Sequence, residues 1–486
     1  MKSRFVGNIV VLGCGSVAQC ALPLIVRHFD IEPSRITVLD MVDNRERVKD
    51  LLAIGIKYEQ EQISRDNYTD LFSRYLRGGD LLIDLAWNLG TVDLLDWCHD
   101  NHVLYVNTSV EEWSPYADSV REDPRKYTLY SRQMQLKELV SRWGHNHGST
   151  AVVDHGANPG LVSHFVKQAL IDINTKILES GGSGARIGAI TRALDEQNFR
   201  KLAQLADVKV IHISERDSQL STVPRRMNEF VNTWSIEGLY EEGVAPAELG
   251  WGTHEKTLPP GAFQFDRGPR NAICLSSIGM NTFTRSWVPS GEIVGMVIRH
   301  GEAFGISDRL TVWEGDKPAY RPTVHYVYCP SDSTIASLHE LRMRQYALQK
   351  EQRILNDEIS DGADELGVLL MGHDFQSWWA GSILSIHEAR RLVPSQNATT
   401  VQVAISVVAA ADWMVRNPRK GLRLPDDVDH SDIMTFSKSY LGEFVSTPVK
   451  WSPLDKLDST FTGYGSSRPS EDDCWQFETF TRGIIS

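Results

Sequence analysis

The chain has 486 residues, which is too long for one ordinary domain and predicts two, with three possible. Its 50 Lys and Arg residues against 63 Asp and Glu residues give a formal net charge of −13. This balance argues against a nucleic-acid partner, which needs a basic surface. With 41% hydrophobic and 23% charged residues, the chain can bury a sizeable core and is not disordered.

The sequence also argues against secretion and against a membrane partner. The N-terminal apolar stretch is short and ends at glycines, so we expect no signal peptide. The most apolar long run, residues 401–415, is about fifteen residues long and contains Gln402 and Asp412, so it predicts a buried helix. Six cysteines lie far apart without a C-x-x-C pair, which predicts a reduced, cytoplasmic protein.

The first 160 or so residues alternate between strand and helix patterns. Apolar, β-branched runs predict strands at residues 8–13, 35–40, 80–86, 102–109 and 150–156. Helical patterns separate them at residues 16–29, 43–54, 67–76, 91–99 and 125–143. Continuous apolar strands that alternate with amphipathic helices predict a doubly wound, Rossmann-type α/β fold with a parallel sheet covered on both faces.

The pattern loosens from about Asn174 onward. The segments VKVIHISERD and CLSSIGMN look like strands, whereas GGSGARIG and HEKTLPPGAF are rich in turn residues, which predicts a second, α+β domain. Near the C-terminus, HEARRLV and the apolar helix can both pack back onto the first domain. The expected division is a Rossmann domain over residues 1–160, an inserted α+β domain over 161–385, and C-terminal helices over 386–486 that return to the first domain.

A glycine-rich turn follows the first predicted strand and opens the first helix. Gly13 permits the tight turn, Gly15 lets the backbone approach a pyrophosphate, and the helix N-terminus faces the anion. Asp40 ends the second strand, where its carboxylate can bind a ribose 2′-hydroxyl and would repel a 2′-phosphate, which favours NAD over NADP. A glycine-rich turn without a ligand is the alternative. The expected cofactor contacts are Gly13, Gly15, Ser16, Val17, Asp40 and Thr108.

Polar residues follow the later strands of the predicted sheet. Asn88 follows the third apolar strand, and Glu111 follows the fourth. Ligands of open parallel sheets lie beyond the carboxyl ends of the strands, so these side chains are candidates for a binding site. Asn158 precedes a proline and a helix, and its amide can contact the nicotinamide end of a cofactor or cap the helix.

The second half of the chain offers further candidates. They are Glu215 and Asp217 after a strand, Trp234, Glu237, Glu241 and Glu242 close together, and His300 after another apolar run. Each has an ordinary alternative, because tryptophan is usually core, adjacent glutamates usually form a solvated turn, and a lone histidine is usually structural. The sequence contains no H-E-x-x-H motif and no clustered metal ligands, so we predict no metal site.

A set of motifs in fixed order is similar to a known family. The segments are VLGCGSVAQCALPLIVRHF, YVNTSVEEW, GANPGLVSHFVKQAL, IHISERD, NTWSIEGLYEEGVAPAELGWGTHE, GMNT and YRPTVHYVY. Over nearly the whole chain they resemble bacterial homospermidine synthases, which are saccharopine-dehydrogenase-like enzymes. The resemblance implies a homodimeric transferase that uses NAD without consuming it. Putrescine gives up a hydride to become an imine, a second putrescine attacks and ammonia leaves, and the hydride returns to yield homospermidine. Spermidine can also donate the aminobutyl group.

The resemblance also implies roles for the candidate residues. Glu111 would bind the far ammonium, and Glu215, Asn158 and His300 would orient the reacting amine. The face of Trp234 would hold a cationic nitrogen, a contact that is worth roughly 2 kcal/mol when desolvated. The implied catalytic residues are Asn158, Glu215, Trp234, Glu242 and His300, and the implied substrate-binding residues are Asn88, Glu111 and Glu237. Asn88 stands where the relatives carry aspartate, which puts the tightness of ammonium binding in doubt.

Two other functions remain as alternatives. An ordinary saccharopine-type amine or amino-acid dehydrogenase would bind a carboxylated substrate and is expected to show arginines in its pocket. A catalytically silent NAD-binding sensor would not need the acids. The carboxylates and the aromatic residue favour a polycation, because a buried diamine needs carboxylates within hydrogen-bond reach. We therefore expect putrescine and spermidine as ligands, NAD as cofactor, a homodimer, and neither nucleic acid nor membrane as a partner.

Overall fold

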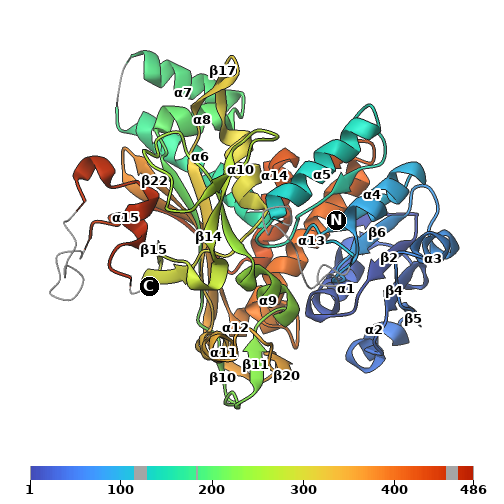
Figure 1. The fold of residues 1–486 in the computed structure, drawn as a ribbon. Helices are drawn as coiled ribbons and strands as arrows, with labels where there is room; N and C mark the ends of the chain where they lie inside the picture. Colours follow the sequence, from blue (N-terminus) through green and yellow to red (C-terminus); the bar gives the residue numbers. More distant parts are fainter. Residues whose placement is uncertain (1, 114–127, 182–183, 456–468, 485–486) are drawn as a thin grey trace.

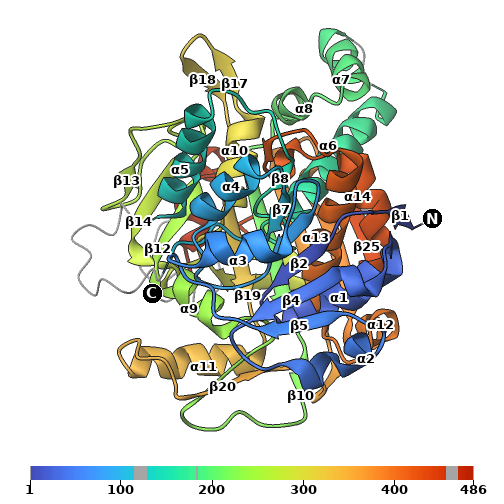
Figure 2. The same ribbon diagram turned by 90° about the vertical axis from the view of Figure 1, so that its right-hand side faces the viewer.

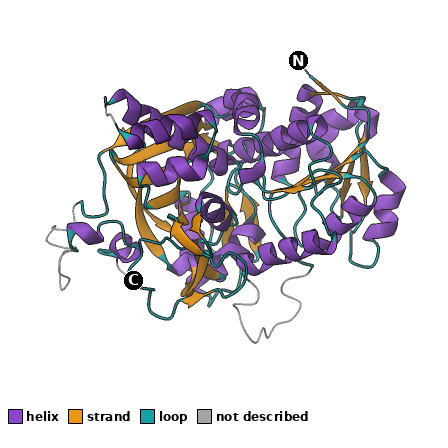
Figure 3. Cartoon of the chain, turned by 90° about the horizontal axis from the view of Figure 1, so that it is seen from above, coloured by secondary structure: helices purple, strands orange, loops and turns teal. Residues whose placement is uncertain are grey.

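The computed structural model describes residues 2–113, 128–181, 184–455 and 469–484. Two large sheets, with helices around and between them, form most of the described structure (Figures 1 and 3). The first sheet has seven strands, all parallel, in the order β24-β8-β7-β6-β2-β4-β5. Its strands are β2 (Ile9–Leu12), β4 (Ile36–Asp40), β5 (Lys57–Gln60), β6 (Leu81–Asp84), β7 (Leu104–Asn107), β8 (Ala151–Val152) and β24 (Leu422–Arg423).

Helices cover both faces of this sheet because alternate strand residues point to opposite sides. Ile9 and Val11 of β2 join the core that includes α1 and α13, whereas Val10 and Leu12 join the core with α3, α4 and α5. The helices are α1 (Ser16–His28), α2 (Lys49–Ala53), α3 (Tyr68–Tyr75), α4 (Thr91–Asp100), α5 (Leu129–Arg142) and α13 (Ala398–Arg416). The predicted doubly wound α/β fold is confirmed.

The second sheet is larger and mostly antiparallel, and its main path runs β13-β14-β12-β19-β9-β22-β23-β25. Only β9 and β19 pair in parallel along this path, among the described residues. The strands are β9 (Val210–Asp217), β12 (Pro246–Gly250), β13 (Phe263–Gln264), β14 (Ala272–Ile278), β15 (Phe283–Val288), β16 (Gly291–Met296), β19 (Thr323–Cys329), β22 (Ala363–His373), β23 (Gln376–Ser385) and β25 (Glu443–Val449).

Helix α6 (Leu161–Glu179) packs across β22 and β23, and α10 (Glu302–Leu310) packs against β12 and β19. The other helices of this half are α7 (Ala185–Asp195), α8 (Phe199–Ala206), α9 (Ile236–Val244), α11 (Asp332–Met343), α12 (Ile386–Leu392), α14 (His430–Ser437) and α15 (Phe477–Thr481). Small strand pairs lie outside the two large sheets: β1 (Ser3–Arg4) with β3 (Phe29–Asp30) in the first half, and, in the second half, β10 (Leu220–Ser221) with β21 (Ile359–Asp361), β11 (Glu229–Asn232) with β20 (Glu351–Ile354), and β17 (Val312–Glu314) with β18 (Lys317–Tyr320).

The C-terminal part of the chain contributes to both halves (Figure 2). Helix α13 packs against α1, and β24 extends the first sheet beside β8. Strand β25 pairs instead with β23 in the large sheet, and α15 lies against β15. Among the residues that the structure describes, α13 alone has the length and apolar composition to cross a membrane, and most of it is buried inside the protein. The domain boundaries predicted at residues 160 and 385 stay predictions.

Several local predictions were wrong. The helix expected at residues 43–54 is a 3₁₀ turn, Arg45–Val48, followed by the short α2. The GARIG segment, which was predicted to be rich in turns, begins α7 after α6 has continued to Glu179. Helices α6, α7 and α8 pack against one another, and this packing favours helix there over the local turn propensity. Residues 125–127 of the helix predicted at 125–143 lie outside the described residues.

Candidate active site

The glycine-rich turn forms a cradle that fits a dinucleotide. Gly13 has a φ of +80°, which favours glycine, and a Cβ there would lie 3.0 Å from the carbonyl oxygen of Leu85. A Cβ on Gly15 would meet nothing within 4 Å, so the space above it is open. Gly15 caps α1 without a side-chain hydrogen bond, and the first turn holds no acidic residue. The N–H groups at Ser16 and Val17 can therefore face a phosphate.

Asp40 lies at the end of β4, directly beside this turn. Its Oδ2 accepts a hydrogen bond from the backbone N–H of Cys14 at 2.5 Å, and its Oδ1 accepts one from Val42 at 2.8 Å. The carboxylate therefore stands next to the cradle as the sequence predicted, and it would repel a 2′-phosphate there. Thr108 follows β7 and packs against Gly156, the glycine of the turn after β8.

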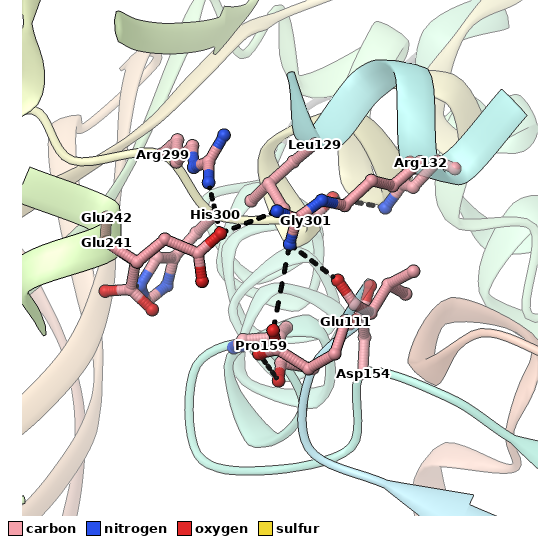
Figure 4. A pocket seen from close by; sticks show the side chains of 13 residues that line it. Glu111, Leu129, Arg132, Asp154, Pro159, Glu241, Glu242, Arg299, His300 and Gly301 are labelled. Carbon is pink, nitrogen blue, oxygen red and sulfur yellow. Dashed lines mark hydrogen bonds and ion pairs between the residues drawn. The ribbon is translucent and has the colours of Figure 1, made fainter. Parts of the chain in front are cut away.

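A pocket opens beyond the carboxyl ends of β7 and β8, where the two halves of the protein meet (Figure 4). The first half contributes the turns after the two strands and the start of α5. The second half contributes the end of α9 and the turn before α10. The lining residues are Ser109, Val110, Glu111, Leu129, Arg132, Gln133, Asp154, Pro159, Glu241, Glu242, Arg299, His300 and Gly301.

His300 lies between two carboxylates. Its Nε2 is 3.0 Å from Glu242 Oε2, and its Nδ1 is 3.2 Å from Glu302 Oε1. Burial alone would lower the pKa of His300, but Glu242 and Glu302 outweigh burial and raise this pKa well above the usual value. We conclude that His300 is an imidazolium, which donates hydrogen bonds through both ring nitrogens.

Glu215 lies on β9 beside His300 and two tyrosines. Its Oε2 accepts a hydrogen bond from Asn158 Nδ2 at 2.9 Å and another from the hydroxyl of Tyr326. Burial is the main cause that raises the pKa of Glu215 to about 7, and Asp217 adds to it. A carboxyl group with this pKa can bind and release a proton near neutral pH, as an acid–base group must.

Trp234 is linked to His300 through two tyrosines. Its indole N–H donates a hydrogen bond to the hydroxyl of Tyr328 at 3.0 Å. The ring of Tyr328 stacks on Tyr326 at a centroid distance of 5.3 Å, and Tyr326 lies 4.4 Å from the His300 ring. The lining residues described for the pocket do not include Trp234, so its predicted contact with the substrate stays a prediction.

The predicted substrate-binding acids differ in their surroundings. Glu111 lines the pocket, and its Oε1 accepts a hydrogen bond from the Ser109 hydroxyl at 2.7 Å. Its Oε2 is buried without a hydrogen bond within the described residues, and burial together with Glu241 raises the pKa of Glu111 to about 7. Asn88 has a φ of +64° and a buried Oδ1 without a hydrogen-bond donor in the described part of the chain. Glu237 is half-buried beside the Ser235 hydroxyl, outside the described lining.

Sequence reasoning missed a buried ionic cluster in the pocket wall. The Nη2 atoms of Arg132 and Arg299 both donate to Oε1 of Glu241, at 2.6 Å and 2.9 Å. The expected alternative for Glu241, a solvated turn, is wrong, because Glu241 is a buried residue of α9. Adjacent helix residues point about 100° apart, which lets Glu241 face the arginines while Glu242 faces His300. No local pattern indicates that Arg132, from the first half, meets Glu241.

Comparison with known families agrees with this two-part architecture. Residues 9–152 match the saccharopine dehydrogenase NADP binding domain, and residues 156–447 match the saccharopine dehydrogenase C-terminal domain. Saccharopine dehydrogenase from Saccharomyces cerevisiae shares the fold, with a TM-score of 0.50 over 91% of this chain and all of that chain, at 13% identity. The fold and the site therefore define a nucleotide-binding enzyme of the saccharopine dehydrogenase type.

Relatives with higher sequence identity show which family within this class the chain belongs to. A homospermidine synthase from Mesorhizobium japonicum is 39% identical over 97% of this chain and 95% of that protein, and one from Blastochloris viridis is 38% identical over 93% of both. The homospermidine synthase of Legionella pneumophila, solved in complex with NAD, superposes with a TM-score of 0.87 at 35% identity and covers 98% of both chains. The chain belongs to the homospermidine synthase family.

Proposed function

We propose that this protein is a homospermidine synthase, which joins two putrescines, or spermidine and putrescine, with NAD as a hydride carrier that is not consumed. The observation that carries the proposal is the 39% identity to a homospermidine synthase over 97% of the chain. The acidic pocket supports it independently, because Glu111, Asp154 and Glu242 all line the place where a diamine would lie. A dication leaves water readily only for such carboxylates.

Bound NAD supplies the acceptor for the substrate hydride and later its donor. The backbone around Gly13 and Gly15 would hold the pyrophosphate, and Asp40 would select the unphosphorylated ribose. In the substrate half, Glu111 has a buried oxygen available for the far ammonium. Glu242, which pairs with His300, would hold the amine that enters and leaves the pocket.

The chain also provides a base for the reacting amine. An ammonium must lose a proton before its carbon can give up a hydride, and Glu215, with a pKa of about 7, can take that proton. Asn158 and Tyr326 hold the Glu215 carboxylate in place. His300 carries a positive charge between two carboxylates, so we assign it to orientation and not to proton uptake. Trp234 would stabilise the cationic nitrogen by its ring face.

Incubation of the pure protein with putrescine and NAD tests the proposal. We expect homospermidine and ammonia in equal amounts, with no net NADH. Accumulation of NADH would support a saccharopine-type dehydrogenase, for which the two arginines in the pocket wall are the favouring observation. No product from putrescine alone, or from spermidine with putrescine, would overturn the proposed transfer and leave an NAD-binding sensor.

The homodimer and the cytoplasmic location are further proposals. Light scattering coupled to size exclusion tests the first, and a mass of one chain would contradict it. Fractionation of the source cells tests the second.

A further inference from the structure

A single glutamate oxygen binds two arginines in the wall of the pocket. Figure 4 shows Glu241 between Arg299 and Arg132, with Glu111 on the other side of Arg132. The side chains of Arg132, Arg299 and Glu241 are only 2%, 5% and 8% exposed. All three line the pocket, so the cluster is part of the surface that a substrate meets.

Other carboxylates lie farther from these guanidinium groups or serve other groups. Arg132 is 3.9 Å from Glu111 and 3.6 Å from Glu112, and Arg299 is 3.9 Å from Glu248. Glu248 accepts hydrogen bonds from the backbone N–H groups of Leu129 and Tyr130, at the start of α5. Among the described residues, Glu241 is therefore the carboxylate nearest to both guanidinium groups at the pocket.

Two converging guanidinium groups are a binding site for a carboxylate. Arginine stays charged in proteins, and its planar donors match carboxylate oxygens closely. Without Glu241, the wall would present this pair to the substrate, which is the arrangement expected of an enzyme for amino acids. With Glu241 in place, the protein supplies the carboxylate itself.

We propose that Glu241 determines specificity by occupying the site formed by Arg132 and Arg299, so that the pocket rejects amines that carry a carboxylate and accepts polyamines. This inference rests on the proposed function, since it takes an amine as the substrate. It assigns a role to a residue that belongs neither to the cofactor cradle nor to the group around Glu215. The lowered pKa of Glu241, for which the two arginines outweigh burial, agrees with a permanently ionised carboxylate.

The substitution Glu241→Gln tests this role with little change in shape. Loss of one negative charge from the pocket wall should raise the KM for putrescine roughly tenfold. The same variant should bind 4-aminobutyrate, in which a carboxylate replaces one ammonium end of the diamine. Calorimetry with 4-aminobutyrate on the NAD-loaded proteins measures this without turnover, and we expect binding to the variant and none to the wild type.

A matched control makes the same chemical change elsewhere. Glu138→Gln removes a carboxylate from the exposed face of α5, where Glu138 lies 3.8 Å from Arg267, and should alter neither measurement. A folded Glu241→Gln protein with an unchanged KM for putrescine and no affinity for 4-aminobutyrate would overturn the proposal.

A second variant, which removes a positive charge and not a negative one, tests the proposal if Glu241→Gln does not fold. Arg132→Gln leaves Glu241 with Arg299 alone, so the pocket becomes more negative, and the KM for putrescine should fall or stay low while 4-aminobutyrate still fails to bind. The double variant Glu241→Gln, Arg132→Gln should bring the KM back toward the wild-type value. Binding of 4-aminobutyrate to Arg132→Gln would contradict the inference. A wild type that makes no homospermidine would overturn the proposed function, whereas the calorimetry judges Glu241 separately.

Discussion

The two parts of the active site, a cofactor half and a substrate half, are built in different ways. The cofactor half consists of backbone at the ends of parallel strands, namely the glycine turn after β2 and the start of α1. The substrate half consists of buried or half-buried side chains from distant elements, such as Glu215 on β9, Glu242 on α9 and His300 before α10. A backbone cradle depends on a few adjacent residues, whereas an ionic cluster depends on the whole fold. The two halves should therefore fail separately when they are mutated.

The largest difference between the effect on kcat and the effect on NAD binding is expected for a substitution of Glu215. Glu215→Gln keeps the shape but cannot take a proton, so kcat should fall by roughly 10²- to 10⁴-fold while the affinity for NAD stays unchanged. Stopped-flow or product assays give kcat, and titration of intrinsic fluorescence gives the affinity for NAD. If kcat fell less than tenfold, another group would be the base.

Glu255 provides a matched control for that experiment. It is also a buried glutamate whose pKa burial raises to about 7, but it accepts hydrogen bonds from Thr323 and from the backbone of Phe477, away from the pocket. Glu255→Gln should lower stability without changing kcat. A comparable loss of kcat in this variant would show that the Glu215 effect is general to buried acids in this sheet.

A substitution in the cofactor half should have the complementary effect and weaken the binding of NAD. Gly15→Val places a side chain in the open space where the backbone meets the pyrophosphate, so the phosphate oxygens can no longer approach the N–H groups there. We expect the dissociation constant for NAD to rise roughly a hundredfold, because hydrogen bonds to a charged group are worth about 1.5–3 kcal/mol, with a normal Tm. Gly188→Val in α7, where a Cβ also meets nothing within 4 Å, is the control and should leave NAD binding intact.

The same contrast decides what the sequence could predict. The glycine turn, Asp40 and the strand–helix alternation lie within short stretches, and the first sheet follows them closely. Strand β5 was missed because it is a mostly exposed edge strand with the polar sequence KYEQ. In the substrate half, the pattern brought Glu242 and His300 forward one by one, but not their pairing, since 58 residues separate them. Arg132 could not be found because nothing local distinguishes it from a surface arginine. Arg299 is adjacent to the candidate His300, but its hydrogen bond to Glu241 could not be read from the sequence.

A smaller effect is expected at Trp234. Trp234→Ala removes an aromatic face worth roughly 2 kcal/mol to a desolvated cation, which corresponds to about a thirtyfold loss in kcat/KM. NAD affinity should hardly change, because Trp234 donates to Tyr328 in the substrate half. Trp234→Phe keeps a ring and should recover part of the loss. A large loss of NAD binding in Trp234→Ala would show that this residue belongs to the cofactor half.

The smallest effect, at Glu302, tests how the substrate half is tuned. Glu302→Gln removes one of the two carboxylates that raise the pKa of His300, and at pH 7 the loss of this charged hydrogen bond should cost roughly two- to tenfold in kcat. His300 acts as a cation, so activity is present below its pKa and is lost as the pH rises through it. The alkaline limb of the pH profile should therefore move to lower pH in Glu302→Gln and return in Glu302→Asp. The acidic limb, which reflects Glu215 with a pKa of about 7, should stay in place, and a shift of that limb instead would show that His300 is the base.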